Sequence, residues 1–195
     1  YCPNDSACPP QIKGRIEHFI SRKAMNIDSL GPETIDDYYQ RGLIRNFSDI
    51  YKLTVSDICG VNKTRVKSAQ KVVDGVKSTL QVPFERVVFA IGIRFVGETT
   101  AKLIARHFKT MDALRNATVE QLMEVDGVGQ VIAESVVKYF RDSKNVAIVD
   151  ELASYGVQMQ LSEEQLSAQT NKLEGKSIVI SGVFQKHSRD EYKAI

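Results

Sequence analysis

The chain has 195 residues, of which 43% are hydrophobic and 26% charged, and its formal net charge at pH 7 is +2. This is the composition of a soluble globular protein with room for one or two domains. No apolar run approaches membrane-spanning length and no segment resembles a signal peptide, which excludes a membrane protein and favours a cytoplasmic location. The chain opens on Tyr1 and stops within a helix-like segment, so we expect a fragment of a longer protein.

Charge is unevenly distributed along the chain. Five basic residues and one acid lie between positions 63 and 77, whereas six acids and two lysines lie between 142 and 174. This pattern fits a core that binds a polyanion, followed by a solvated linker, although two ordinary charged helix faces would look the same.

The three cysteines are too few for a disulfide framework. Cys2 and Cys8 lie in a polar, proline-rich stretch with no apolar context. Cys59, in "VSDICGV", is predicted to be a small buried hydrophobic residue.

An internal repeat organises the middle of the chain. At an offset of 64, "FSDIYKLTVSDI" (47–58) aligns with "MDALRNATVEQL" (111–122), and Thr54 and Thr118 are predicted helix N-caps. A half-period is marked by Gly31, Gly97 and Gly129, while the expected position near Arg65 lacks glycine. Residues 28–157 are therefore predicted to form four helix-turn-helix units in two pairs.

The stretch "VDGVGQVIA" (125–133) has two possible interpretations. A dinucleotide-binding loop would need a third glycine, but Ile132 stands there, and the preceding residues have helical rather than strand spacing. A tight turn between two helices fits better.

Glycine at such a turn suits an anion. It permits positive φ, and without a Cβ it lets a ligand approach the unpaired N–H groups at the positive end of the next helix. Hydroxyls and cations follow the turns at Thr34, Lys67, Ser68, Thr99, Thr100 and Lys102. We therefore predict binding of nucleic-acid backbone phosphates.

These features resemble the helix-hairpin-helix (HhH) motif, matched in full by "VDGVGQVIA". The resemblance implies contacts to duplex DNA across the minor groove, largely without sequence readout. The candidate DNA-binding residues are Arg22, Lys23, Gly31, Lys67, Ser68, Arg94, Gly97, Thr99, Thr100, Gly127 and Gly129.

Three segments resemble segments that occur in the same order in bacterial NAD-dependent DNA ligases: "HFISRKAMNIDSLG", "FAIGIRFVGETTA" and "LEGKSIVISGVF". The resemblance implies a mainly α chain: the second half of a four-cysteine zinc finger and a connecting segment (1–27), a tandem HhH domain (28–157), a linker (158–172) and a truncated α/β BRCT start (173–195). Cys2 and Cys8 would then be two of four zinc ligands.

By the same resemblance, the partner is nicked double-stranded DNA, bound by a monomer. The parent enzyme would use NAD and magnesium, but the fragment should be inactive alone because the Lys-x-Asp-Gly adenylation motif is absent; "KVVDG" (71–75) is one residue too long. Two alternatives remain: an HhH module from another DNA-repair protein, or a protein-interaction scaffold.

Overall fold

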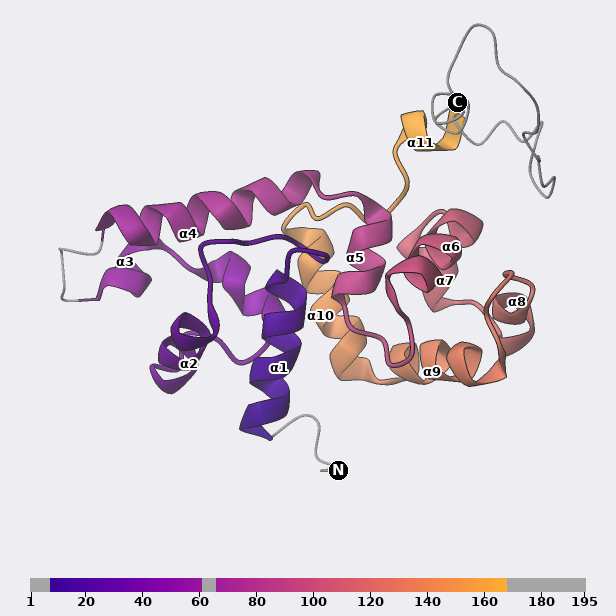
Figure 1. Cartoon of the computed structure of the whole chain (residues 1–195), viewed down its shortest axis with the longest axis horizontal. Coiled ribbons are helices and arrows are strands. Elements are labelled where there is room, and N and C mark those ends of the chain that lie inside the picture. The colour runs from indigo at the N-terminus through magenta and orange to yellow at the C-terminus, as the bar shows by residue number, and fades with distance from the viewer. Residues whose placement is uncertain (1–7, 61–65, 168–195) are drawn as a thin grey trace, which may run out of the picture. The chain divides into compact units, whose positions relative to one another are not determined.

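The computed structural model describes residues 8–60 and 66–167, and within these ranges the chain is helical with no β-strand (Figure 1). The described residues up to Ser162 belong to one compact unit, while Glu163–Ser167 belong to a second. Cys2 and the segment 173–195, with its predicted zinc and BRCT features, lie outside the described residues. None of the described helices is long and apolar enough to cross a membrane.

Helices account for most of the described chain. Their bounds are α1 Pro9–Ile20, α2 Pro32–Gln40, η1 Phe47–Lys52, α3 Val55–Cys59, α4 Val66–Ser78, η3 Thr79–Gln81, α5 Phe84–Ala90, α6 Glu98–Phe108, α7 Met111–Arg115, α8 Val119–Met123, α9 Gln130–Arg141, α10 Ser143–Ser154 and α11 Glu163–Ser167, where η marks a 3-10 helix.

The predicted repeat is visible in the helix starts. The α3 and α8 helices begin at 55 and 119, and α4 and α9 begin at 66 and 130, so both pairs are offset by 64 residues. Thr54 and Thr118 cap α3 and α8 through their hydroxyls, each within a capping box, as predicted. Asn46 and Thr110, also 64 residues apart, cap η1 and α7 with their side-chain oxygens, Asn46 within a capping box.

Helices that are consecutive or nearly so pack in pairs: α1 with α2, α3 with α4, α5 with α6, and α8 with α9. Their buried faces join one hydrophobic core. Within it the rings of Phe19 and Phe47 stack with centroids 4.7 Å apart, which ties α1 to η1.

The α10 helix connects the two halves of the repeat. It packs against η1 of the first half and α9 of the second (Figure 1). The carboxylate of Glu151 accepts from the Ser48 hydroxyl and pairs with Lys52 at 2.6 Å, while Asp150 pairs with Arg115 of α7 at 2.9 Å. Adjacent acids of one helix thus hold the two repeat-related elements η1 and α7.

Two segments differ from the predicted division. Residues 9–27, set apart as a zinc-finger end and connector, form α1 and a turn whose side chains, including Ile16 and Phe19, belong to the common core. Residues 158–161, assigned to the linker, instead pack on the α6–α7 junction. There the Leu161 N–H donates to the Lys109 carbonyl at 2.9 Å, and the Leu161 side chain is buried.

Candidate nucleic-acid interface

Three helix starts share one turn geometry. In each, the residue before a glycine is buried and its N–H donates to the carbonyl three residues earlier; the glycine carbonyl then accepts from the N–H four residues later. The first set of bonds is Leu30 to Ile27, Val96 to Ile93 and Val128 to Val125, at 3.2, 3.1 and 3.0 Å. The second is Ile35 to Gly31, Ala101 to Gly97 and Ala133 to Gly129, at 3.0, 2.8 and 3.0 Å.

Each glycine is the N-cap of the helix that follows. Gly31 precedes α2, Gly97 precedes α6 and Gly129 precedes α9, and at none of them does a side chain cap the first N–H groups. The first turn of an α-helix carries unpaired donors and a partial positive charge. These three helix starts are therefore suited to an external anion.

The fold itself gives no reason for glycine at these caps. A Cβ built on Gly31, Gly97 or Gly129 would meet no atom within 4 Å. Their φ angles are −118°, −83° and −85°, in the extended region that any residue adopts, so the expectation of positive φ at these caps is wrong. Positive φ occurs instead at Gly127, at 80°, two residues before the cap. Gly31, Gly97 and Gly129 thus keep the space before the helix open.

The three helix starts are electrostatically unequal. Pro32 removes an N–H from the first turn of α2, and Glu33 and Glu98 put acids into the first turns of α2 and α6. The first turn of α9 contains no acid. The start of α9 is therefore the most favourable of the three for a phosphate.

The second predicted hairpin lies between α3 and α4. Its turn, including Arg65, falls outside the described residues. Lys67 and Ser68 are exposed in the first turn of α4, which contains no acid. Their side chains are therefore accessible to a phosphate.

Basic residues of the turn after α1 approach the third hairpin. Arg86 donates to the carbonyls of Arg22 and Lys23, at 2.6 and 3.2 Å, and so fixes this turn. The Lys23 ammonium lies 3.3 Å from the Glu98 carboxylate at the start of α6, with both side chains largely exposed. Lys23 and Gly97 are therefore brought together, and Arg22 is exposed beside Lys23. Glu98, which the sequence analysis did not single out, neutralises part of this charge.

The remaining predicted DNA-binding residues of the second half of the repeat lie near the starts of α6 and α9. Thr99 is exposed and Thr100 is half-buried in the first turn of α6. Gly127 is exposed in the turn of the fourth hairpin, just before α9. The Arg94 carbonyl accepts from the Ser135 hydroxyl of α9 at 2.7 Å, and its exposed guanidinium lies over the Phe95 ring, 4.8 Å from the centroid.

Cys8 is the described member of the predicted zinc pair. It is half-buried, is not in a disulfide and is the N-cap residue of α1. Within the described residues, no group of three or more His, Cys, Asp or Glu side chains comes together as a metal site would require. The donors described here do not complete a tetrahedral site.

Turns of this geometry, in repeated pairs with open helix starts, are typical of helix-hairpin-helix motifs. Residues 86–149 match the family described as "Helix-hairpin-helix motif". Over all 195 residues the chain is 56% identical to a DNA ligase of Phocaeicola vulgatus and 53% identical to one of Parabacteroides distasonis. Over 193 residues it is 48% identical to a DNA ligase of Flavobacterium psychrophilum.

The chain spans 29% of the length of each of these relatives. It is therefore similar, over its whole length, to a segment of bacterial DNA ligases, and residues 86–149 of it carry a helix-hairpin-helix motif.

Proposed function

We propose that this chain holds nicked double-stranded DNA by its backbone phosphates, as the duplex-binding part of an NAD-dependent DNA ligase that seals nicks in replication and repair. The observation that carries the proposal is the set of three glycine N-caps. They are open, lack side-chain caps and are required neither by φ nor by packing. Backbone amides at a helix start bind a phosphate oxygen without reading bases.

The proposed grip is spread over both halves of the repeat. The start of α9 and the start of α6, with Lys23 beside it, would hold phosphates at the third and fourth hairpins. Gly31, Lys67 and Ser68 would add weaker contacts from the first half. Because these groups meet phosphate, affinity should fall steeply with salt.

We propose that the nick-sealing chemistry belongs to the remainder of the ligase. By the family resemblance, that chemistry adenylates a lysine from NAD, passes AMP to the 5′-phosphate and releases it as the 3′-hydroxyl attacks with magnesium. Here Lys71 and Gly75 of "KVVDG" lie within the helix α4. The chain alone should therefore bind nicks without sealing them.

Zinc is proposed to bind Cys2 and Cys8 only when other parts of the ligase supply the remaining ligands. Two thiolates leave a tetrahedral site half-filled. Metal analysis of the purified chain should find well under one zinc per monomer, and stoichiometric zinc would show that further ligands exist.

A salt-dependent binding titration tests the duplex-binding proposal. Scrambling the duplex sequence at constant length should change the binding free energy by less than roughly 1 kcal/mol, below the usual effect of one mismatch in a specific site. The logarithm of affinity should fall linearly with the logarithm of salt concentration for nicked and intact duplexes alike. Strong preference for one sequence, or binding indifferent to salt, would contradict the proposal.

A further inference from the structure

Phe95 combines two unfavourable features in one residue. Its φ is +66°, in the left-handed region where a bulky side chain is a genuine outlier. Its side chain is 55% exposed, and it is the only exposed phenylalanine or tyrosine among residues 8–60 and 66–167. Exposed strain of this kind is retained where function requires it.

The fourth hairpin shows that the fold does not need an aromatic residue here. Phe95 lies two residues before its glycine cap Gly97, and Gly127 lies two residues before Gly129 with a similar φ of +80°. Glycine adopts this backbone without strain. A glycine would therefore serve the third turn equally well, and the phenyl ring is an addition to it.

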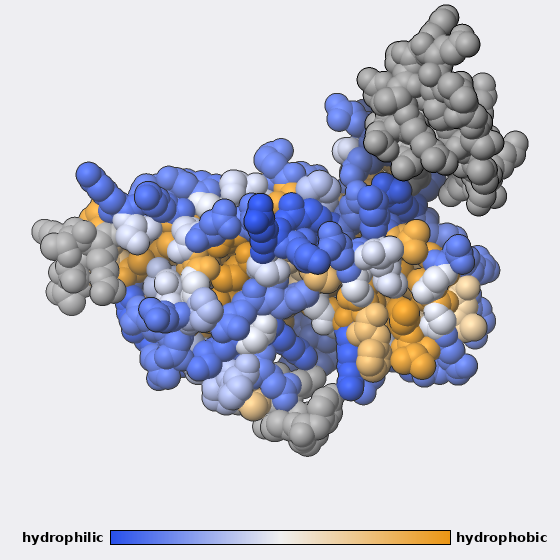
Figure 2. Space-filling model, in the orientation of Figure 1, coloured by the Kyte–Doolittle hydropathy of each residue, from blue (hydrophilic) through white to orange (hydrophobic). Residues whose placement is uncertain are grey.

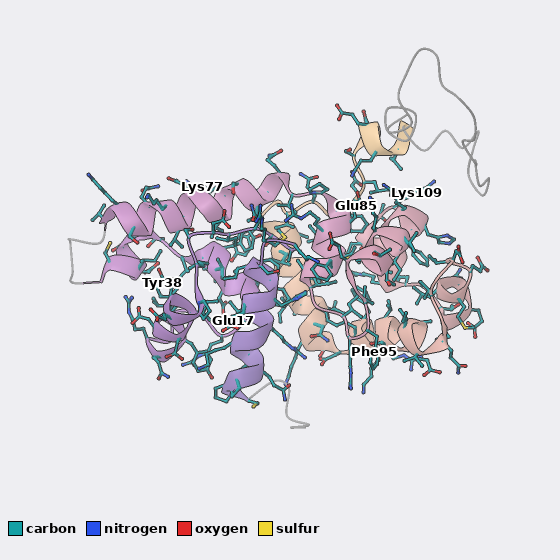
Figure 3. The ribbon with its side chains drawn as sticks, in the orientation of Figure 1. Glu17, Tyr38, Lys77, Glu85, Phe95 and Lys109 are labelled. Atoms are coloured by element: carbon teal, nitrogen blue, oxygen red, sulfur yellow. The ribbon has the colours of Figure 1, made fainter. Side chains whose placement is uncertain are left out.

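The two hairpins face each other in a reciprocal arrangement. Leu103, six residues after Gly97, lies 3.7 Å from a Cβ built on Gly127. Ser135, six residues after Gly129, donates to the Arg94 carbonyl next to Phe95 at 2.7 Å. The loop that carries Phe95 is thus fixed against α9 through the residue that precedes Phe95, and Figure 3 shows Phe95 beside this helix.

Apolar surface gathers at the same place. Val131, in the first turn of α9 and one helical turn before Ser135, is 62% exposed. Figure 2 shows apolar surface over α6, α9 and the loop before α6. The Arg94 guanidinium lies over the Phe95 ring, so a cation borders this apolar surface.

We propose that Phe95, together with the exposed Val131 of α9, enters the minor groove of the bound duplex and packs against deoxyribose edges next to the phosphates held at Gly97 and Gly129. This inference rests on the proposed function. The chemistry fits, because sugar C–H edges are the apolar part of the groove and apolar side chains act as wedges that bend duplexes. A duplex is proposed rather than an apolar protein partner because the two helix starts and the Arg94 guanidinium next to this surface favour a polyanion.

Phe95→Asn separates this role from a structural one. Asparagine tolerates the left-handed backbone better than phenylalanine, so the variant should melt at the same or a higher temperature. It should nevertheless bind nicked duplex about five- to tenfold more weakly, since the loss of apolar contact is uncompensated. The salt slope should stay unchanged because no charge is removed. Phe95→Leu, which keeps an apolar side chain, should retain most of the affinity.

A duplex with donor and acceptor dyes at its ends gives the second readout. Energy transfer should rise when the wild-type 195-residue chain binds, and should rise less with Phe95→Asn at saturating protein. If folded Phe95→Asn binds and bends the duplex as the wild type does, the proposal that Phe95 acts as a wedge is wrong, and a protein partner is the remaining explanation of the apolar surface. The salt-dependent duplex binding of the proposed function would not be affected by this result. Salt-independent binding by the wild type would instead overturn the proposed function itself.

Discussion

Residues at the helix starts of this chain serve two different purposes. Asn46, Thr54, Thr110, Thr118 and Asp142 close their helices with side-chain hydrogen bonds. Gly31, Gly97 and Gly129 leave theirs open. Open and closed starts occur within one hairpin, at Gly129 and Thr118. Side-chain caps are therefore missing at all three starts where a phosphate is proposed to bind, and also at α1 and α5, whose N-caps are Cys8 and Pro83 rather than glycine.

Two helical glycines allow a prediction at the same scale. Gly14 in α1 has open space where a Cβ would stand, whereas a Cβ on Gly75 in α4 would lie 2.9 Å from the Ser29 hydroxyl oxygen and 3.4 Å from Ile27. Gly14→Ala should stabilise the fold by roughly 0.5–1 kcal/mol through lower unfolded-state entropy. Gly75→Ala should lose that gain by displacing the buried hydroxyl of Ser29.

Urea unfolding of both variants measures the difference. Both changes put alanine into a helix interior, so each serves as the other's control for helix propensity. Equal stabilisation by the two would show that the close approach of α4 to the 27–29 turn does not constrain Gly75.

At the scale of elements, α10 holds the repeat together through Glu151. Lys52, followed by the Ser48 hydroxyl, lowers the pKa of the Glu151 carboxyl below its ordinary value of 4.5. A carboxyl whose pKa is depressed on folding stabilises the folded state above its unfolded pKa. That stabilisation is lost as the pH falls through the folded-state pKa.

Glu151→Gln should therefore lower the free energy of unfolding at pH 7 by about 1 kcal/mol. The gap between variant and wild type should close as the pH falls below 4.5, when the wild-type carboxyl is protonated too. Asp150→Asn, at the neighbouring and more exposed pair with Arg115, is the control and should have a smaller effect at pH 7. A gap that stays constant down to acid pH would exclude the charged pair as its cause.

How well the sequence predicted the elements depended on whether their signals were local. The Thr54 and Thr118 caps and the turn glycines are local, and they located the repeat and the hairpin starts. The packing of Leu161 on Lys109 joins segments about fifty residues apart and leaves no pattern at either place. Phe95 could not be predicted because glycine is the usual sequence signal of a left-handed turn residue, and at this turn a phenylalanine takes that conformation.

At the scale of the whole molecule, the two halves of the repeat are not equal binding surfaces. The second half has two long helices with open glycine starts, one of them free of acids in its first turn. In the first half Pro32 and Glu33 weaken the start of α2. Duplex affinity should therefore depend mainly on the third and fourth hairpins, and Gly31→Val should reduce it less than Gly129→Val.

Duplex affinity of Gly129→Val as a function of salt tests the central claim most directly, with Thr118→Val as the matched control. Both variants disturb a helix start of the fourth hairpin without changing charge, and circular dichroism confirms folding at the working temperature. Gly129→Val should bind nicked duplex more weakly at every salt concentration, with a nearly unchanged salt slope because no charge is removed. Thr118→Val should cost about 1 kcal/mol of stability and leave affinity unchanged. Unaltered affinity in folded Gly129→Val would contradict the phosphate-binding role of the open helix starts.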